Sequence, residues 1–250
     1  MRTLTWSSGG GVQSTAIAVL VAQRKLPTPE LMVMADTGRE QTPVWDYLRD
    51  YVNPMLRQTV GREIEIAGHA LATVDLYSKS GKLLIPAFTA PSGKLPTYCS
   101  TEWKRRVVRR WLRLKGHGPR RPIDTWIGIS RDEITRMKDS DVDWQRYTYP
   151  LIDLVPTRRV DCIQLVLDAG LPTPPRSSCW MCPFHTRAEW VEMTPSDKAK
   201  AILLDEEIRQ QDPNVYLHNS RKPLIEVLEM TDGEEVDERD GVCDSGYCFV

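Results

Sequence analysis

LTWSSGGGVQSTAIAVLVA, residues 4–22, joins an apolar strand to an apolar helix through a loop of glycine and serine. Consecutive glycines let backbone N–H groups turn toward one point and approach an anion closely. The start of the following helix adds unpaired N–H groups and a partial positive charge. Ser8, Ser14 and Thr15 can donate hydroxyl hydrogen bonds. The stretch therefore predicts a phosphate-binding loop, with a tight strand-to-helix turn as the simpler alternative.

The loop matches neither of the common nucleotide-binding patterns. A Walker A loop ends in Gly-Lys-Ser/Thr, and no lysine occurs between Arg2 and Lys25. A Rossmann loop has spaced glycines, whereas Gly9, Gly10 and Gly11 are contiguous. We expect Gly9→Val or Gly10→Val to abolish nucleotide binding and to leave the fold largely intact.

Length and composition limit the class of protein. A chain of 250 residues can bury one full core with a small appendage. The net charge of −1 disfavours a generally basic nucleic-acid coat. No apolar stretch approaches the 18 residues of a membrane span, and the chain enters a strand without a signal region. These features predict a cytoplasmic location with no membrane partner, where the six cysteines serve a purpose other than disulfides.

Strand and helix patterns alternate along the chain. Strands are expected at 4–6, 31–35, 63–67 and 125–129, and helices at 16–22, 43–56, 101–114 and 161–169. Residues 74–98 have the prolines and glycines of a long loop. This order predicts an α/β fold with a doubly wound, mostly parallel sheet and a small C-terminal cysteine-bearing extension. We expect a nucleotide-binding domain over 1–175 and a helical, cysteine-rich segment over 176–250 that completes a metal-cluster site.

Three motifs follow predicted strands directly. They are the glycine-rich loop, Asp36-Thr37-Gly38 and Gly128-Ile129-Ser130-Arg131. Ligands of doubly wound sheets bind at the carboxyl ends of the strands. Three motifs at one edge favour a nucleotide crevice over three unrelated turns.

These motifs carry a family resemblance over roughly residues 4–185. Ser8-Gly9-Gly10 through Ser14 resembles the PP-loop of ATP pyrophosphatases, and residues 36–38 resemble the Asp-Thr-Gly of phosphoadenosine-phosphosulfate (PAPS) reductase-like proteins. Residues 128–136 are similar to the Gly-x-Arg-x-x-Glu-x-x-Arg segment of that superfamily, and 149–153 to its Tyr-Pro-Leu-x-Asp. The chain differs in the inserted Gly11 and Val12, and in Gln13, where the family has aspartate. The retained glycines resemble the ATP-using branch, which includes DNA phosphorothioation and tRNA thiolation enzymes.

The resemblance implies a reaction and a set of residues. ATP, with Mg²⁺, would be cleaved between its α and β phosphates to adenylate a substrate oxygen, and sulfur would then displace AMP. Arg131 and Arg136 would bind substrate phosphate in catalysis. Apart from the resemblance, Lys104 and Arg105 are candidates for substrate phosphate, because these cations follow Cys99 within two turns. The expected nucleotide-binding residues are Ser8, Gly9, Gly10, Gly11, Gln13, Ser14, Thr15, Asp36, Thr37, Gly38 and Gly128.

The cysteines suggest a metal centre. Cys179 and Cys182 form a C-x-x-C pair whose thiolates can hold one metal or cluster. Cys99 resembles the first ligand of iron–sulfur members of the superfamily, and Cys243 or Cys248 could complete a [4Fe-4S] site. The expected cluster ligands are Cys99, Cys179, Cys182 and Cys243. Zinc held by Cys99, Cys179, Cys182 and His185 is the alternative, and thiolate-rich sites suit either metal. Cys162 lies inside a predicted helix, and we expect its side chain to pack in the core.

The stretch from Lys104 to Arg121 holds nine lysines and arginines and no acid. It is either a solvated helix face or a surface that attracts a phosphate-bearing substrate, including a nucleic acid. Residues 229–240 carry seven acids and one arginine, typical of an exposed lead-in to the terminal cysteines.

The favoured function is an ATP-using, cluster-bearing sulfurtransferase acting on a nucleotide or nucleic acid, with a sulfur-donor protein as a further partner. One alternative is a PAPS reductase-like enzyme in which the Cys248 thiolate is the catalytic nucleophile. Another is a zinc-stabilised nucleotide- and nucleic-acid-binding module without catalysis. No serine-protease-type or His-Glu-x-x-His pattern supports hydrolase chemistry.

Overall fold

The computed structural model describes residues 2–68, 75–90 and 93–230. These residues form two compact units. The first contains the described residues of 1–74 and Ser100–Ser177, and the second contains those of Asp75–Cys99 and from Ser178 onward. The boundary expected between residues 175 and 176 lies close to the change of unit after Ser177, and residues 75–99 belong to the second unit as well.

A five-stranded parallel sheet forms the centre of the first unit. Its strands are β1 (Thr3–Ser8), β2 (Leu31–Ala35), β3 (Glu65–Ala67), β5 (Ile123–Ile127) and β6 (Gln145–Thr148). Their order is β3-β2-β1-β5-β6, and every neighbouring pair is parallel. The chain moves outward from β1 to β3 and then crosses to β5 on the other side of β1. The predicted doubly wound α/β fold is therefore confirmed.

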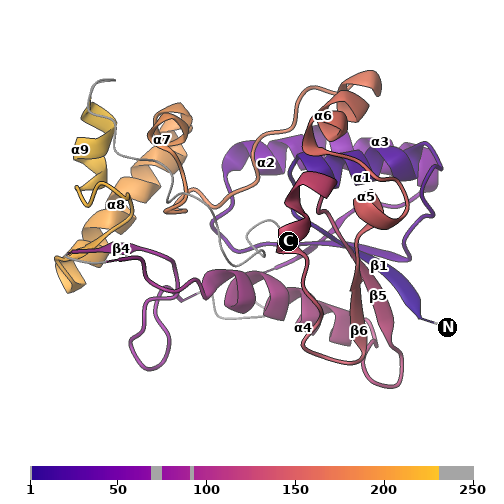
Figure 1. The fold of residues 1–250 in the computed structure, drawn as a ribbon, viewed down its shortest axis with the longest axis horizontal. Coiled ribbons are helices and arrows are strands. Elements are labelled where there is room, and N and C mark those ends of the chain that lie inside the picture. The colour runs from indigo at the N-terminus through magenta and orange to yellow at the C-terminus, as the bar shows by residue number, and fades with distance from the viewer. Residues whose placement is uncertain (1, 69–74, 91–92, 231–250) are drawn as a thin grey trace. The chain divides into compact units, whose positions relative to one another are not determined.

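Helices cover both faces of this sheet. In Figure 1, α4 lies on the opposite side of the sheet from α1, α3 and α6. Helix α1 packs chiefly against α6 and α3, and α4 packs against β2 and β3. The helices of the first unit are α1 (Val12–Ala22), α2 (Thr42–Tyr47), η1 (Leu48–Val52), α3 (Asn53–Val60), η3 (Ser100–Arg105), α4 (Arg106–Leu114), η4 (Arg131–Arg136), α5 (Pro150–Asp153) and α6 (Arg159–Asp168).

Successive side chains along the strands point to opposite faces of the sheet, so a hydrophobic core forms on each face. Trp6, Met32 and Met34 pack on the α1 side, whereas Val33 and Ala35 pack on the α4 side. Helix α1 is buried from Val12 to Val21, as its all-round apolar sequence predicts. Cys162 of α6 is fully buried in the α1-side core, which confirms its packing role. Burial, aided by nearby aspartates, raises the pKa of this thiol to about 12.

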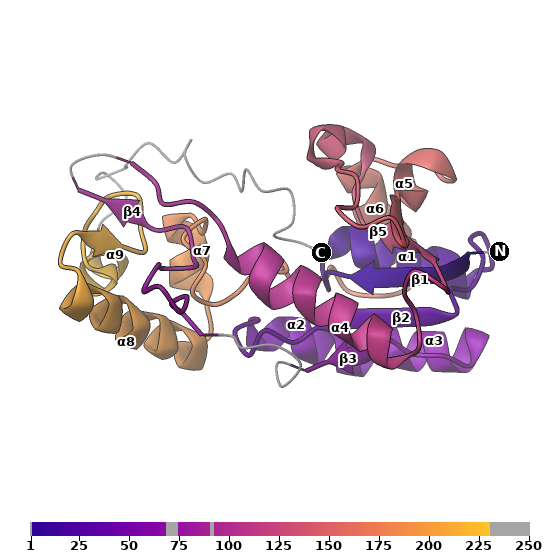
Figure 2. The ribbon, with the colours of Figure 1, turned by 90° about the horizontal axis from the view of Figure 1, so that it is seen from below.

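The second unit combines a small antiparallel pair with three helices. Strand β4 (Phe88–Thr89) pairs with β7 (Val215–Tyr216), so part of the predicted loop at 74–98 has regular structure. The helices are α7 (Arg187–Glu192), α8 (Pro195–Gln211) and α9 (Leu224–Glu229). Thr186 and Thr194 cap α7 and α8 through their side chains, as threonine commonly does at helix starts. Figure 2 shows these helices and strand β4 together. None of the helices in the described part of the chain has the length and apolar character needed to cross a membrane.

We expect the stability of the protein to fall as the pH falls from about 6.5 to 4, because of His218. Burial of this imidazole, with the positive charge of Arg187, lowers its pKa from 6.5 to about 4. The unfolded chain therefore gains a proton in this range that the folded chain does not, which removes about 3 kcal/mol of unfolding free energy. Denaturant unfolding at several pH values measures the loss, and His218→Gln should flatten it. An equal pH slope in the variant would contradict the assignment.

Candidate functional site

The candidate site lies where the winding of the sheet reverses, between the carboxyl ends of β1 and β5. The glycine-rich loop leaves β1 at Ser8, and Gly128 follows β5. Doubly wound sheets bind ligands at this switch point. A methyl group on Gly128 would lie 3.3 Å from Ser14 Oγ and 3.4 Å from Ser14 N. The structure thus brings together two motifs that the sequence separates by more than a hundred residues.

Serine hydroxyls hold the glycine-rich loop in shape. Gly9 N–H donates to Ser14 Oγ at 2.9 Å, and Gly10 N–H donates to Ser8 Oγ at 3.2 Å. A hydroxyl that accepts a hydrogen bond keeps its own proton for donation. Gly11 is the N-cap residue of α1 and provides no side-chain cap. No side chain at the N-cap position therefore accepts from the first turn of α1, and the start of such a helix is suited to an anion.

The expectation that Gly10→Val leaves the fold largely intact is wrong. Its φ is +75°, and a Cβ atom here would lie 2.8 Å from Val44 Cγ1 and 2.9 Å from Met34 Cε. The side of Gly10 that a side chain would occupy faces the core. Gly10→Val therefore disturbs the fold as well as the loop, and it does not separate binding from folding.

Thr15 and Gln13 use their side chains within the protein. The Thr15 hydroxyl donates to the Gly11 carbonyl at 3.1 Å, inside the first turn of α1. Gln13 is buried, and its Nε2 donates to Glu133 Oε2 at 2.7 Å. Its Oε1 accepts from Arg159 Nη1 at 3.0 Å. Gln13 thus joins the start of α1 to η4 and α6. The sequence analysis did not indicate either contact.

The two predicted catalytic arginines lie in η4. Arg131 is exposed, and its backbone N–H donates to the Thr157 carbonyl at 2.9 Å. Arg136 pairs with Glu133 at 2.6 Å. Because Glu133 also accepts from Gln13, Arg136 is linked to the glycine-rich loop through one carboxylate.

The predicted motif at 36–38 forms a turn at the end of β2. Asp36 Oδ1 accepts from Gly38 N–H at 2.7 Å, and Gly38 has a φ of 66°. Aspartate commonly bonds its own backbone two residues on in such turns, and glycine permits the left-handed backbone. Thr37 is fully buried and accepts from Arg39 N–H at 3.2 Å. Glu40 follows this turn two residues after Gly38.

Glu40 forms a buried ion pair that sequence patterns did not indicate. Its Oε2 lies 3.3 Å from Lys104 Nζ, with side-chain exposures of 0% for Glu40 and 9% for Lys104. Ser177 Oγ lies 3.3 Å from Glu40 Oε1 and also contacts the Gly9 carbonyl. Lys104, predicted to bind substrate phosphate, is thus paired with a carboxylate beside the loop. A lone acid in a loop gives no sequence signal for such a role.

Acids from other elements pair with much of the basic stretch. Arg105 lies 3.4 Å from Asp141 and donates to Thr101 at 3.2 Å. Arg109 also pairs with Asp141. Among the residues that the structure describes, the ion pairs of this stretch include Lys104–Glu40, Arg105–Asp141, Arg106–Glu102, Arg109–Asp141 and Lys115–Glu65. A large part of the positive charge is therefore offset within the first unit.

A small pocket beside the glycine-rich loop has room for about one water molecule. Tyr47 in its wall donates to the Pro172 carbonyl at 2.6 Å, and burial raises the pKa of Tyr47 to about 12. The pocket is lined by Ser8, Gly10, Ser14, Thr15, Tyr47, Leu48, Val52 and Ile64. Four of the predicted nucleotide-binding residues thus line one space.

Three of the predicted metal ligands belong to the second unit. Cys182 N–H donates to the Cys179 carbonyl at 3.0 Å, so this pair sits on one turn, and Cys99 N–H donates to Leu84 at 2.8 Å. No disulfide forms among the four cysteines that the structure describes. Cys243 and Cys248 lie outside the described residues.

Neither the three described cluster cysteines nor the zinc set forms a metal-binding group among the described residues. Within residues 2–68, 75–90 and 93–230, no three His, Cys, Asp or Glu side chains form a group that could hold a metal ion. His185 is buried, bonds Ser178 Oγ through Nε2 at 2.8 Å, and packs edge-on against Trp190 at 4.8 Å between ring centroids. Zinc held by Cys99, Cys179, Cys182 and His185 therefore stays a prediction, as does a cluster held by the three cysteines.

Comparisons with known proteins give little beyond a likeness of fold. No family model matches the chain, and no curated protein matches it. A similar solved structure is the U34-tRNA thiolase NcsA from Methanococcus maripaludis with its [4Fe-4S] cluster, at 14% sequence identity and a TM-score of 0.43. The alignment covers 93% of this chain and 74% of that one.

Proposed function

We propose that this chain is an ATP-using enzyme of the PP-loop type that adenylates a nucleotide or nucleic-acid acceptor and replaces the activated oxygen with sulfur. The observation that carries the proposal is the start of α1, which lacks a side-chain cap and follows a glycine-rich loop at the switch point of the sheet. Its backbone N–H groups are suited to the phosphates of ATP.

The proposed reaction has two displacements. An acceptor oxygen attacks the α-phosphorus of ATP, which forms an acceptor–AMP ester and releases pyrophosphate. A sulfide then attacks the acceptor carbon, and AMP leaves with the oxygen. Negative charge grows on the phosphate oxygens in the first step, and fixed N–H and hydroxyl donors such as Ser14 stabilise it without reorganising.

The second unit is proposed to supply a thiolate-bound [4Fe-4S] cluster. Cys179 and Cys182 share a turn, and Cys99 belongs to the same unit. Thiolates are the donors that iron–sulfur clusters prefer. Cys243 or Cys248 is proposed as the fourth ligand, and the cluster would supply the sulfur chemistry when bound.

A nucleic-acid acceptor is supported by the exposed part of the basic stretch. Arg110, Arg120 and Arg121 are exposed, and Arg113 is exposed beside Trp144. Phosphate backbones are bound mainly by such cations. We therefore propose an acceptor that carries phosphate, bound along α4, and a sulfur-donor protein as the second partner.

We expect Gly128→Val to weaken ATP binding by about tenfold or more, because its Cβ atom would crowd Ser14 Oγ at 3.3 Å and the valine methyl groups would narrow the space beside the loop. Gly118→Val is the matched control, because a Cβ atom there meets no atom within 4 Å. Calorimetry with ATP and Mg²⁺ measures the affinities, and ATP–pyrophosphate exchange tests adenylation. Wild-type affinity in a folded Gly128→Val protein would remove the loop from the ATP site.

We expect Cys179→Ser to lose iron and visible absorbance in protein purified without oxygen. Cys162→Ala is the control, since this thiol is buried in the core of the first unit. Cys243→Ser and Cys248→Ser distinguish the terminal cysteines: a ligand variant loses iron, whereas a nucleophile variant keeps iron and loses turnover. Colourless protein with stoichiometric zinc would contradict the cluster, and retained iron in both terminal variants would favour the reductase alternative.

A further inference from the structure

Arg159 is a cation that a neutral side chain holds at the start of α1. It is the first residue of α6, and its Nη1 donates at 3.0 Å to Gln13 Oε1, in the first turn of α1. Its backbone N–H donates to the Asp132 carboxylate at 3.1 Å, so both the backbone and the side chain of Arg159 are fixed by neighbours. Among the residues that the structure describes, no carboxylate forms an ion pair with its guanidinium. The positive charge of Arg159 is therefore not offset by a direct ion pair.

Gln13 is suited to hold this cation without cancelling its charge. The amide is buried, and its Nε2 donates to Glu133 Oε2 at 2.7 Å while its Oε1 faces Arg159. A carboxylate only accepts hydrogen bonds and an arginine only donates them, so the two partners fix which end of the amide faces which. A carboxylate in place of this amide would neutralise Arg159 and repel Glu133. The neutral amide of Gln13 therefore keeps the guanidinium both charged and in place.

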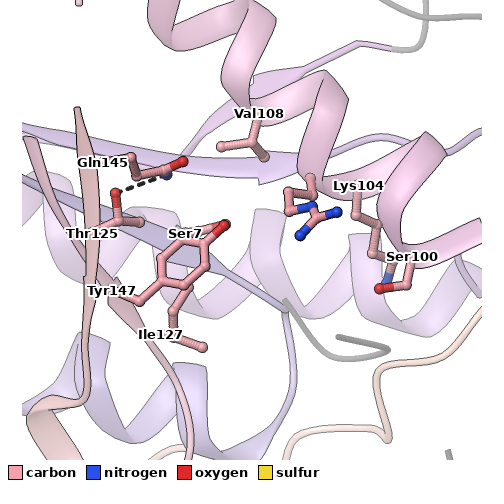
Figure 3. Close-up of a pocket in the computed structure, with 9 residues that line it drawn as sticks. Ser7, Ser100, Lys104, Val108, Thr125, Ile127, Gln145 and Tyr147 are labelled. Carbon is pink, nitrogen blue, oxygen red and sulfur yellow. Dashed lines mark hydrogen bonds between the residues drawn. The ribbon is translucent and has the colours of Figure 1, made fainter. Parts of the chain in front are cut away.

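Two other cations beside the loop are paired with acids. Arg136 pairs with Glu133 at 2.6 Å, and Lys104 pairs with Glu40 at 3.3 Å. Lys104 also lines the space on the α4 side of the sheet, at the carboxyl ends of β1, β5 and β6 (Figure 3). That space has room for about one water molecule, so a chain of phosphates does not fit between α4 and the sheet. Arg159 on the α1 side is thus better placed to meet an anion than Lys104 is.

The start of α1 and the guanidinium favour the same kind of ligand. Helix α1 begins at Gly11 without a side-chain cap, and such a helix start is suited to an anion. Arginine binds phosphate oxygens through parallel N–H bonds. A guanidinium has five N–H donors, and the Nη1 of Arg159 uses one of them on Gln13. Helix start and cation are separated by the length of one glutamine side chain.

We propose that Arg159 binds a phosphate group of the nucleotide and that Gln13 is the positioning residue that holds it there. The inference rests on the proposed function, which places the phosphates of ATP at the start of α1. It adds a cation from α6 to the two arginines of η4 that the sequence indicated. It also gives Gln13 a role that needs a neutral amide, since only such a group donates to Glu133 and accepts from Arg159 at once.

Four variants of the full chain test this assignment. Arg159→Ala removes the cation, Gln13→Leu removes the amide at similar volume, and a double variant combines the two. Arg158→Ala is the matched control, because it removes an exposed cation one residue earlier in the chain. Calorimetry with ATP and with pyrophosphate, each in the presence of Mg²⁺, measures the affinities. Thermal unfolding checks that every variant folds.

We expect Arg159→Ala to weaken the binding of both probes by about tenfold, as the loss of a charge-assisted hydrogen bond does. Gln13→Leu should weaken both by about threefold or more, and should add little once Arg159 is alanine, because Gln13 acts through Arg159. The effect of Arg159→Ala should shrink between about 0.1 M and about 0.5 M salt, since its side chain is exposed and salt screens its charge. A purely structural role would not produce this salt dependence. Arg158→Ala should bind nearly as tightly as the wild type.

The outcomes separate this inference from the proposed function. Wild-type affinity for both probes in a folded Arg159→Ala protein, with ATP–pyrophosphate exchange intact, would overturn the phosphate role of Arg159 alone. An equal loss in Arg158→Ala would also overturn it, and additive losses in the double variant would overturn the positioning role of Gln13. A wild-type protein that binds neither probe would contradict the proposed function and this inference with it. Binding that Arg159→Ala weakens, without any exchange in the wild type, would support the phosphate site and contradict the proposed adenylation.

Discussion

Gly10→Ala is expected to destabilise the first unit far more than Gly61→Ala, although both glycines have nearly the same backbone conformation. Gly10 has a φ of +75° and Gly61 a φ of +67°. Each alanine variant therefore loses about 1–2 kcal/mol to the left-handed backbone. A Cβ atom at Gly61 meets nothing within 4 Å, whereas at Gly10 it would lie 2.8 Å from Val44 Cγ1 and 2.9 Å from Met34 Cε. Only Gly10→Ala must also displace packed side chains.

Overpacking of a well-packed core costs typically 1–3 kcal/mol in addition. We therefore expect Gly10→Ala to lower the unfolding free energy by about 2–5 kcal/mol, and Gly61→Ala by about 1–2 kcal/mol. Urea unfolding followed by tryptophan fluorescence measures both, and Trp6 of the sheet reports on this region. Equal losses in the two variants would mean that the loop moves away from Val44 and Met34 without cost.

The fold could be predicted from the sequence because its signals are local. The strand, glycine-rich loop and buried helix at 4–22 form one contiguous pattern, and the apolar run at 31–35 matches β2 residue for residue. Strand β6 was missed since Gln-Arg-Tyr-Thr at 145–148 has no apolar run and forms the edge of the sheet. Residues 75–99 belong to the second unit through contacts with distant parts of the chain, which no local pattern reports.

Only those residues of the candidate site that lie within one sequence motif could be predicted from the sequence. The sequence indicated the glycine-rich loop and Gly128, which the structure places next to each other, because glycine is required where backbones approach closely. Glu40, Ser177 and Arg159 were missed, since each reaches the loop region from an element far along the chain. Acids that neutralise the basic stretch were missed for the same reason. Charge pairing across a fold is a property of the tertiary structure.

Glu40→Gln is expected to cost about 3–5 kcal/mol of unfolding free energy, the loss typical when one partner of a buried ion pair is removed. Glu40 has a side-chain exposure of 0% and Lys104 one of 9%, so solvent can replace little of the lost carboxylate charge. The control is Glu65→Gln, which removes the acid from the Lys115–Glu65 pair. Those side chains are 42% and 39% exposed, and such surface pairs contribute about 0–1 kcal/mol.

A double variant tests whether the loss comes from the buried charge itself. Glu40→Gln combined with Lys104→Met removes both charges and keeps similar side-chain volumes, so most of the stability should return. Urea unfolding of the wild type, both single variants and the double variant gives the coupling energy between Glu40 and Lys104. Additive losses would show that the two side chains stabilise the unit independently. Ser177 contacts both Glu40 and the Gly9 carbonyl, so loss of the Glu40 charge should also disturb the loop and weaken ATP binding. If the two charges are coupled, the double variant should regain ATP affinity together with stability.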